Sequence, residues 1–594
     1  MRVAVVDKEK CRSDKCDQVC IRFCPMVRTR REAIRLNDDG KAYVSEFICS
    51  GCGICVRKCP YSALSIVNLP DELESEHIHR FGPNDFTLFR MPVPREGAVI
   101  GLLGKNAIGK STVLKILAGE MLPNLGKWDR PPKRDEIVDH FSGTPQHDYL
   151  EKLYSGNIKV VYKPQYVDQI PKIVKGTVRE ILDRMDERGE MKNIARELEL
   201  TNLYDRTLDI LSGGELQRVA IAAAVGRDAE LYLLDEPSSY LDIYQRIKTA
   251  RVIRSLLVEN RNVITAEHDL AVLDYLSDHI YLIYGRPNIY GIVSNIHVVR
   301  EGINQYIQGY IPDENVRFRE TPIIFNVKPP STSHGKARPL LQWTEITKKY
   351  EEFSLKVDAG NIGIGEVVGI LGPNGIGKTT FVKILAGVEE STEGVVTPGE
   401  MQVSYKPQYL TGTVHGTVED ILRRAAGDKY LEPWFNAEVI EPLHVKHMLD
   451  RKVEYLSGGE LQRAAIAECL SRQADIYLLD EPSAYLDVEE RLAVAKAIRR
   501  ITKMNGVTAF VVEHDIVAMD FISDKIMVFD GKPGKTGHAG EPLSLEKGMN
   551  AFLKQMDITF RRDQDTKRPR VNKEESRLDK EQKKTGNYYY QQIY

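Results

Sequence analysis

The chain alternates short apolar runs with glycine-rich or acidic turns, and the same succession occurs twice. The runs AVIGLL and VVGIL each precede a glycine-rich turn and a helix-like stretch, STVLKILAG or TTFVKILAG. Further along, the runs ELYLL and DIYLL each end in an Asp-Glu pair. Short apolar runs bounded by turn signals indicate buried strands, and the longer stretches that follow indicate helices. The pattern predicts two copies of one α/β domain.

Identical and nearly identical segments support this internal repeat. LSGGELQR occurs at 211–218 and again at 456–463. Three other segments recur in the same order: VVYKPQY as VSYKPQY, LYLLDEPSSYLD as IYLLDEPSAYLD, and ITAEHD as FVVEHD. The two halves of the chain therefore carry the same set of motifs.

The spacing of the repeats reveals an insertion in the first half. Lys110 and Lys378 lie 268 positions apart, whereas Gln165 and Gln408 lie 243 apart. About 25 extra residues must therefore lie within 120–158. There the segments RDEIVDHF and HDYLEKLY predict two short helices across a Ser-Gly-Thr-Pro break. This helix–loop–helix is either a surface elaboration or a docking element.

Each glycine-rich turn is a P-loop, because GKNAIGKST and GPNGIGKTT both have the spacing G-x4-G-K-[ST] between a strand and a helix. The backbone amides of such a loop and the helix N-terminus bind phosphates. The lysine reaches the β- and γ-phosphates, and the next hydroxyl ligates Mg²⁺. The predicted ATP-binding residues are Gly104, Asn106, Gly109, Lys110, Ser111 and Thr112, with Gly372, Asn374, Gly375, Gly377, Lys378, Thr379 and Thr380.

The acidic pairs at the strand ends predict the hydrolytic groups. Asp235 and Asp480 would join Ser111 and Thr379 as Mg²⁺ ligands, and Glu236 and Glu481 would orient or deprotonate the attacking water. Two further matched pairs complete the predicted catalytic set. His268 and His514 would bond the γ-phosphate, and Gln165 and Gln408 would complete the coordination of Mg²⁺ and water.

In this order the motifs resemble those of the ATP-binding cassette family, over about residues 75–555. In that family each LSGG signature completes the site of the opposite half. The resemblance assigns Ser212, Gly213 and Gly214 to the Lys378 site, and Ser457, Gly458 and Gly459 to the Lys110 site. It also implies an aromatic residue that stacks on adenine. Tyr350 is the candidate in the second half, and Phe81, with Phe86 as the alternative, in the first.

Cysteines are concentrated at the N-terminus, with eight of nine in the first 59 residues. Four of them form C-x2-C-x2-C-x3-C-P, the bacterial ferredoxin run, in which the last cysteine ligates the other cluster. Two [4Fe–4S] clusters are predicted, one held by Cys24, Cys49, Cys52 and Cys55 and the other by Cys11, Cys16, Cys20 and Cys59. Zinc is the alternative, although its cysteine pairs usually lie further apart. The isolated Cys469 is interpreted as a small buried residue.

Composition excludes several classes of protein. The 594 residues, 42% hydrophobic and 28% charged with a net charge of −3, suit a soluble protein of three or four domains and not a globally basic nucleic-acid coat. No apolar run is long enough for a transmembrane helix, and the first residues do not form a signal peptide. A cytoplasmic protein is expected.

Twin cluster motifs ahead of two cassettes with EPS[SA]YLD segments resemble the class E cassette ATPases, the RNase L inhibitor family, in its archaeal form. The resemblance implies an α/β fold with two ABC-type nucleotide-binding domains arranged head to tail after an α+β ferredoxin-like domain. The expected divisions are 1–72 for the ferredoxin-like domain, 73–308 and 341–552 for the cassettes, 309–340 for a hinge, and 553–594 for a second hinge and tail. The tail after Asp563 is either a flexible end or a docking strand.

The same resemblance implies the function and the partners. An Mg²⁺-dependent ATPase of this family splits post-termination or stalled ribosomes into subunits when its two ATP sites close and swing the iron–sulfur domain. The expected partners are the small ribosomal subunit and the ribosome, a release factor or a Pelota-type factor, and initiation factors. No membrane partner is expected, and the protein would be a monomer with an intramolecular cassette pair. The alternatives are a transporter or iron–sulfur assembly ATPase, and an ATP-coupled electron-transfer protein.

Overall fold

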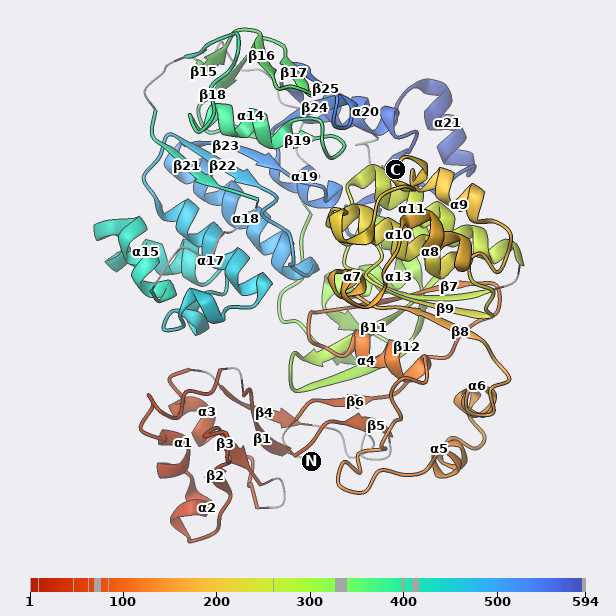
Figure 1. Ribbon diagram of the computed structural model, residues 1–594. Helices are drawn as coiled ribbons and strands as arrows, with labels where there is room; N and C mark the ends of the chain where they lie inside the picture. Colours follow the sequence, from red (N-terminus) through yellow and green to blue (C-terminus); the bar gives the residue numbers. More distant parts are fainter. Residues whose placement is uncertain are drawn as a thin grey trace. The chain divides into compact units, whose positions relative to one another are not determined.

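The computed structural model describes the chain except residues 1, 9, 46–47, 62, 69–75, 84, 260, 326–338, 398–400, 409–415 and 590–594. The described chain forms two compact units (Figure 1). The first comprises residues 1–237, 251–268 and 276–321, and the second comprises 238–250, 269–275 and 322–594. Two short segments of the first half, at 238–250 and 269–275, therefore pack with the second half.

The first unit is built on an eight-stranded sheet. Its strands, in spatial order, are β5 (His77–Arg80), β6 (Thr87–Phe89), β12 (Tyr290–Val298), β11 (His279–Arg286), β7 (Val99–Gly104), β10 (Asn262–Ala266), β9 (Leu231–Asp235) and β8 (Val160–Lys163). From β11 to β8 all neighbours are parallel, whereas β11–β12 and β5–β6 are antiparallel. The parallel strands β7 and β9 are buried along their whole length, as their apolar runs predict.

The helices of the first half follow the motifs. The P-loop helix α4 (Lys110–Leu117) packs on β7, β9 and β10, where its apolar face joins the core of the sheet. The signature LSGGELQR opens α10 (Gly213–Gly226). The remaining helices are α7 (Ile170–Ile173), α8 (Val178–Arg184), α9 (Met191–Glu197), α11 (Ile243–Ser255), α12 (Leu270–Leu276) and α13 (Val299–Gln308).

The second half repeats this architecture strand for strand. Its main sheet has the order β16 (Ile346–Lys349), β17 (Ser354–Val357), β25 (Thr536–Ala539), β24 (Lys525–Lys532), β19 (Val367–Leu371), β23 (Thr508–Val512), β22 (Ile476–Asp480) and β21 (Val403–Lys406), with β26 (Leu543–Ser544) beside β24. A smaller sheet contains β18 (Gly360–Gly363), β15 (Pro339–Trp343) and β20 (Val396–Thr397). The predicted internal repeat is confirmed.

The helices of the second half correspond in the same way. Both α14 (Lys378–Leu385) and α17 (Gly458–Ser471) begin at the second copies of the P-loop and the signature. The others are α15 (Val418–Ala426), α16 (Pro433–Phe435), α18 (Val488–Asn505), α19 (Ile516–Ile522) and α20 (Leu545–Gln555). Cys469 lies on α17 and is 3% exposed, which confirms that it is a buried residue.

The predicted insertion is a pair of helices, α5 (Arg134–His140) and α6 (Pro145–Tyr154), between α4 and β8. In the second half, the described residues between α14 and β21 contain only the two-residue strand β20. The helices α5 and α6 contact each other, and Ile137 and Leu150 are fully buried in the core of the first sheet. The insertion is thus anchored at its base by apolar packing.

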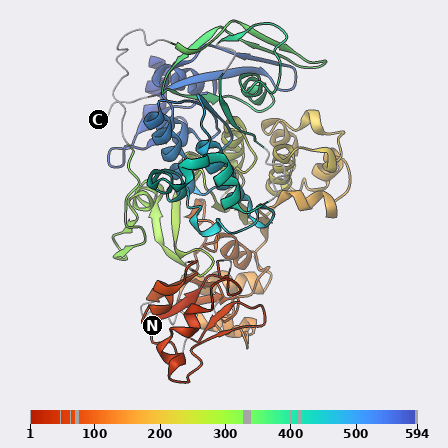
Figure 2. The same cartoon turned by 90° about the vertical axis from the view of Figure 1, so that its left-hand side faces the viewer.

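The N-terminal module, drawn in red, consists of short strands and short helices (Figure 2). β1 (Arg2–Val6) pairs with β4 (Leu64–Asn68), and β2 (Ile34–Leu36) pairs with β3 (Ala42–Val44), both antiparallel. The helices are α1 (Val19–Arg22), α2 (Pro25–Arg28) and α3 (Ile54–Lys58). Its small core includes the buried thiols of Cys11, Cys20, Cys24 and Cys55.

The segment after the second cassette is folded through Tyr589. β27 (Phe560–Arg562) pairs with β28 (Pro569–Val571), and α21 (Arg577–Thr585) follows. Arg568 is fully buried and Tyr589 is 1% exposed. Of the two interpretations of this tail, a flexible end does not describe residues 564–589. In the first half, the hinge-like segment after α13 forms the hairpin β13 (Tyr310–Ile311) and β14 (Val316–Arg317).

Candidate ATP-hydrolysis sites and cysteine module

The two P-loops are alike at the glycine that precedes the lysine. Gly109 has φ 106° and Gly377 has φ 93°, in the left-handed region that favours glycine. A Cβ atom at Gly109 would also lie 2.8 Å from the ring of Phe86. Each loop lysine is buried and donates hydrogen bonds to carbonyls of its own loop, from Lys110 to Gly104 at 3.0 Å and from Lys378 to Gly372 at 2.8 Å. Both lysines are thus held inside the loop curve, where phosphates bind P-loops.

The predicted magnesium ligands lie together in both halves. The hydroxyl of Thr379 donates to Asp480 Oδ2 at 2.7 Å, and Ser111 is a hydrogen-bond partner of Asp235. Oδ1 of each aspartate is buried without a hydrogen-bond partner. Burial raises the pKa of both carboxyls. A buried, unpaired carboxylate oxygen beside a hydroxyl is a ligand set that suits Mg²⁺.

Each predicted catalytic glutamate is held by the predicted glutamine and histidine. Gln165 Nε2 donates to Glu236 Oε1 at 2.8 Å, and His268 Nε2 lies 3.1 Å from the same oxygen. In the second half, Gln408 lies 2.8 Å and His514 lies 3.3 Å from Glu481 Oε1. The structure therefore brings together the three groups that the sequence placed about 30 to 70 residues apart. A direct magnesium role for the two glutamines stays a prediction.

The charge of Glu481 is set by its neighbours. Burial acts to raise its pKa, but His514, Lys378 and Gln408 outweigh burial and lower the pKa to about 2. The carboxylate is therefore ionised at neutral pH. Held by two side chains, it can accept a hydrogen bond from a water molecule and orient it for attack.

The signature serines are the N-caps of α10 and α17. Ser212 accepts a hydrogen bond from Glu215 N and donates to Glu215 Oε2 at 2.8 Å, which forms a capping box. Ser457 and Glu460 repeat this arrangement, with a hydroxyl-to-carboxylate distance of 3.0 Å. Both serines are exposed. Each signature thus presents an exposed serine and the free amides of a helix N-terminus, which bind anions.

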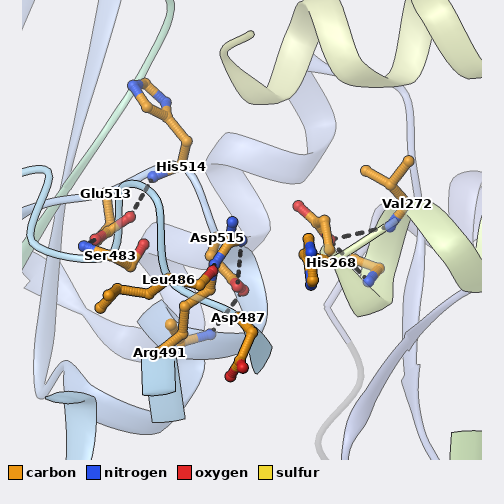
Figure 3. A network of polar contacts seen from close by, with 12 residues as sticks. His268, Val272, Ser483, Leu486, Asp487, Arg491, Glu513, His514 and Asp515 are labelled. Carbon is orange, nitrogen blue, oxygen red and sulfur yellow. Dashed lines mark hydrogen bonds and ion pairs between the residues drawn. The ribbon is translucent and has the colours of Figure 1, made fainter. Parts of the chain in front are cut away.

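The segment that follows Glu481 is held by polar contacts (Figure 3). Ser483 N donates to Glu513 at 2.6 Å, and Arg491 donates to Leu486 O at 2.8 Å and lies 3.4 Å from Asp515. These contacts fix the EPSAYLD segment to the turn that carries His514.

One contact of the second P-loop was missed by the sequence analysis. Asp242, at the end of the first EPSSYLD segment, accepts a 2.8 Å hydrogen bond from Asn374 N. Both residues belong to the second compact unit. The rings of Tyr240 and Tyr485, from the two copies of the segment, have centroids 6.4 Å apart. The sequence contained a signal, because Asp242 is the last residue of a repeated motif, but the motif does not name its partner.

The first P-loop opens on a cavity of about 450 Å³. Phe81, which is half exposed, and Phe86 both line this cavity, and the ring of Phe86 also packs beneath Gly109. The exposed ring is the better placed of the two for stacking on adenine. In the second half the ring of Tyr350 is also exposed, and its hydroxyl contacts Glu389.

The N-terminal module also lines this cavity. Val6, Asp7 and Lys8 are among the lining residues, and Lys8 forms an ion pair with Asp85 beside Phe81. The sequence analysis did not identify these residues, because nothing in the local pattern links the end of β1 to a P-loop about 100 residues later. The two halves therefore differ in what surrounds the nucleotide-binding loop.

The cysteines form the two predicted groups. Burial and the adjacent thiols of Cys49, Cys52 and Cys24 raise the pKa of Cys55 to about 12. Burial and then the thiols of Cys16, Cys11 and Cys59 raise the pKa of Cys20 to about 11. All eight thiols are free of disulfides. Crowded buried thiols are costly to ionise unless a cation compensates their charge.

Backbone amides also point at these sulfurs. Ala4 N and Gly51 N donate to Cys49 Sγ at 3.5 and 3.4 Å, and Ala42 N and Ala63 N donate to Cys11 and Cys59 at 3.4 Å each. Such N–H···S bonds are typical of iron–sulfur sites. Among the described residues, no three potential ligands converge on a single metal ion. Cys24, Cys49, Cys52 and Cys55 line one small cavity of the module.

Comparisons with known proteins agree with this geometry. Residues 94–239 and 355–484 match the ABC transporter family model, 1–32 match a possible Fer4-like domain in RNase L inhibitor, and 42–65 match a 4Fe-4S binding domain. An uncharacterized ABC transporter ATP-binding protein of Methanocaldococcus jannaschii is 52% identical, over 99% of this chain and 98% of that protein. The chain belongs to the RNase L inhibitor family, class E of the ATP-binding cassette proteins. It is an ATPase with a 4Fe–4S-binding module.

Two other members of the RNase L inhibitor family extend the comparison. Translation initiation factor RLI1 of Saccharomyces cerevisiae is 45% identical over 99% of this chain and 98% of its own. A structure described as ribosome-bound archaeal Pelota and ABCE1 superposes with a TM-score of 0.92, at 51% identity and 99% coverage of both chains. The greater identity with archaeal members agrees with the expected archaeal form. Within the described residues, no helix is long and apolar enough to cross a bilayer.

Proposed function

We propose that this chain is a ribosome-recycling ATPase that separates post-termination or stalled ribosomes into subunits in the cytoplasm. The observation that carries the proposal is the likeness over 99% of its length to an ABCE1 chain from a ribosome-bound assembly with Pelota. Similarity confined to the cassettes would suit any ATPase of the superfamily. Here it extends through the cysteine module and the α5–α6 insertion. A Pelota-type factor, a release factor and initiation factors are the proposed partners.

In the proposed mechanism each ATP is bound by one P-loop and completed by the signature of the other half. Lys110 and Lys378 would hold the β- and γ-phosphates, and Ser457 and Ser212 would meet the γ-phosphate from across. Mg²⁺, held by the Asp235–Ser111 and Asp480–Thr379 pairs, would neutralise the charge that develops on the phosphates. ATP can drive closure only through its higher affinity for the closed state, and loss of the γ-phosphate reverses closure.

Two glutamates would then direct hydrolysis. Glu236 and Glu481 would each orient a water molecule in line with the γ-phosphate, while Gln165 and Gln408 hold the carboxylates. His268 and His514 would sense the γ-phosphate from the adjoining strand ends. Segments 309–340 and 553–594 are proposed as the hinges of this motion, between cassettes at 73–308 and 341–552.

The N-terminal module, residues 1–72, would carry two [4Fe–4S] clusters as rigid structural groups. Cys24, Cys49, Cys52 and Cys55 are the proposed ligands of one cluster. The other would be held by Cys11, Cys16, Cys20 and Cys59. Four thiolates per cluster supply the ligands that cubanes require. Since Val6, Asp7 and Lys8 line the first nucleotide cavity, a movement of the bound nucleotide would be transmitted to this module directly.

Substitution of one cluster ligand tests the ligand sets. We expect Cys55→Ser to lose about half of the iron and of the visible absorbance, because one of two clusters loses a thiolate. The matched control is Cys469→Ser, which removes the buried thiol outside the module and should keep the full iron content. Iron and zinc analysis of the purified full-length proteins is the measurement. Stoichiometric zinc, or unchanged iron in Cys55→Ser, would contradict the assignment.

The insertion offers a surface suited to ribosomal RNA. Lys127, Trp128, Arg130 and Lys133 are all exposed on the segment that leads into α5. Basic side chains bind phosphates, and an exposed aromatic ring can stack on a base. The segment belongs to the first half alone, so it would give the ATPase a defined orientation on its partner.

Co-sedimentation with ribosomal subunits tests the proposed function. The full-length protein with a non-hydrolysable ATP analogue is expected to pellet with small subunits, and much less without nucleotide. The triple variant Lys127→Ala, Arg130→Ala, Lys133→Ala should bind about tenfold more weakly, with a shallower salt dependence. A matched triple, Lys172→Ala, Lys175→Ala, Lys192→Ala, removes the same charge from other exposed positions. If the protein with the ATP analogue does not co-sediment with ribosomal subunits, the proposed recycling function is wrong.

A further inference from the structure

Each catalytic glutamate sits in an unusual backbone conformation. Glu236 and Glu481 both have φ 46°, in the left-handed region that costs a non-glycine residue about 1 kcal/mol or more. Their N–H groups are satisfied identically, by Ala266 O and Val512 O at 3.0 Å each. A strained turn persists only when its surroundings hold it in place. The same strain at equivalent positions in both halves indicates a shared support.

One part of this support is a buried lysine on the neighbouring strand. Lys163, on β8, is 2% exposed and donates to Asp235 O at 3.0 Å. Lys406, on β21, is 1% exposed and donates to Asp480 O at 2.8 Å and to Glu481 O at 3.1 Å. Burying an ammonium in a sheet is costly, so a small apolar residue would serve packing better. Both halves nevertheless place a lysine on the carbonyls of this turn.

The other part is a buried glutamine on the signature helix. Gln217, fully buried on α10, donates to Glu236 O at 2.8 Å and to Pro237 O at 3.0 Å. Gln462 is 2% exposed on α17 and donates to Glu481 O at 2.6 Å. Lysine and glutamine therefore approach the same turn from two different elements.

We propose that Lys163 with Gln217, and Lys406 with Gln462, are positioning residues that clamp the backbone of the catalytic glutamates. Neither pair touches substrate. The clamps fix the carbonyls on either side of the strained residue, and thereby the direction of its side chain. This inference rests on the catalytic role proposed for Glu236 and Glu481.

The clamp has a consequence for communication between sites. Gln217 lies five residues after Ser212 on one helix, and Gln462 lies five residues after Ser457. An α-helix transmits displacement along its axis because its backbone hydrogen bonds are continuous. A phosphate that engages a signature serine would therefore act, through the helix and its glutamine, on the glutamate of the same half.

The test uses substitutions that keep the approximate size of the side chain but remove its hydrogen-bond donors. Such variants distinguish a role in positioning the glutamates from a role in folding. In the full-length protein, Lys163→Met with Lys406→Met should lower kcat about tenfold to a hundredfold, because small misplacements of reacting groups carry penalties of that size. The KM for ATP and the Kd for a fluorescent ATP analogue should change less than about twofold. Lys163→Arg with Lys406→Arg retains donors and should recover part of kcat.

Gln217→Met with Gln462→Met tests the other half of each clamp. This variant should show the same loss of kcat at unchanged nucleotide affinity. If the lysine variants do not fold, it decides whether the clamp positions the catalytic glutamates. The matched control is Tyr232→Phe with Tyr477→Phe, on β9 and β22, the strands that lead to the two catalytic glutamates. These hydroxyls donate to backbone carbonyls at the C-terminal ends of α10 and α17, Tyr232 to Arg227 O at 2.5 Å and Tyr477 to Arg472 O at 3.2 Å. The control should lower the thermal midpoint but leave kcat unchanged.

The outcomes are distinct. Folded methionine variants with wild-type kcat would overturn the clamp, as would equal losses of kcat in the tyrosine control. Failure of the underlying function would have another signature, since Glu236→Gln with Glu481→Gln would then turn over normally whatever the clamp variants do.

Discussion

Replacement of Glu236 and Glu481 by glutamine is expected to lower the ATPase rate of the full-length protein about 10²- to 10⁴-fold. The amide keeps the shape of the side chain but cannot accept a proton from water or carry the negative charge that orients it. Nucleotide binding should persist, because Lys110, Lys378 and both signatures are unchanged. The double variant should therefore accumulate with ATP bound and remain on small ribosomal subunits.

Single-turnover hydrolysis and co-sedimentation with ATP are the measurements. Glu230→Gln is the control, because it neutralises an exposed glutamate just before β9, the strand that delivers Glu236. It should leave both hydrolysis and subunit binding unchanged. Rapid ATP turnover in the double variant would show that these glutamates are not catalytic. Trapped ATP without binding to ribosomal subunits would agree with the catalytic role but contradict the recycling function.

The second large effect is expected at Asp274, on α12. This carboxylate is fully buried and meets two arginines of the C-terminal segment, Arg568 at 3.2 Å and Arg570 through two bonds of 2.9 Å. Burial acts to raise the pKa of Asp274, but the two guanidinium groups outweigh it and the pKa is lowered. Asp274→Ala would remove the carboxylate that contacts both arginines, of which Arg568 is also fully buried. Breaking a buried pair from one side costs about 3–5 kcal/mol.

The thermal midpoint and hydrogen exchange over residues 560–589 check this prediction. We expect a midpoint lower by several degrees and rapid exchange across β27, β28 and α21, because the segment loses its main polar anchor to α12. Lys580→Ala is the control, since it removes an exposed ion pair with Glu575 in the same segment. Exposed pairs contribute at most about 1 kcal/mol. Equal effects of the two variants would show that burial of the Asp274 pair contributes nothing.

Much of each ATP site could be predicted from the sequence because its parts are local. A P-loop needs only a strand, a glycine turn at Gly109 or Gly377 and a helix, all within about twenty residues. The signature needs only a serine N-cap and the glutamate three positions later. The cysteine groups are similar, because short spacing forces thiols around one centre. Only the exchange of Cys24 and Cys59, each of which is assigned to the cluster of the other group, required knowledge of the ferredoxin pattern.

Contacts between distant segments depended on the fold. Asp242 and Asn374 are 132 positions apart, and Asp274 and Arg568 are 294 apart. Aspartates and arginines are common, so sequence pattern does not select one pair from many. The fold selects it by burying both groups at one place, where an unpaired charge would be costly.

The sequence by itself determined the repeat, the order of motifs and the class of nucleotide site, and it predicts the cluster ligand groups, because each rests on spacing along the chain. Only the tertiary structure decided which groups support the chemistry. It placed Lys163 and Gln217 on the carbonyls beside Glu236, and Lys8 at the first nucleotide cavity. It also showed that residues 564–589 are folded onto α12 and not loose. Spacing along the chain decides which ligand a short segment can bind. Burial decides which distant polar side chains must form hydrogen bonds or ion pairs with each other, because buried polar groups need partners.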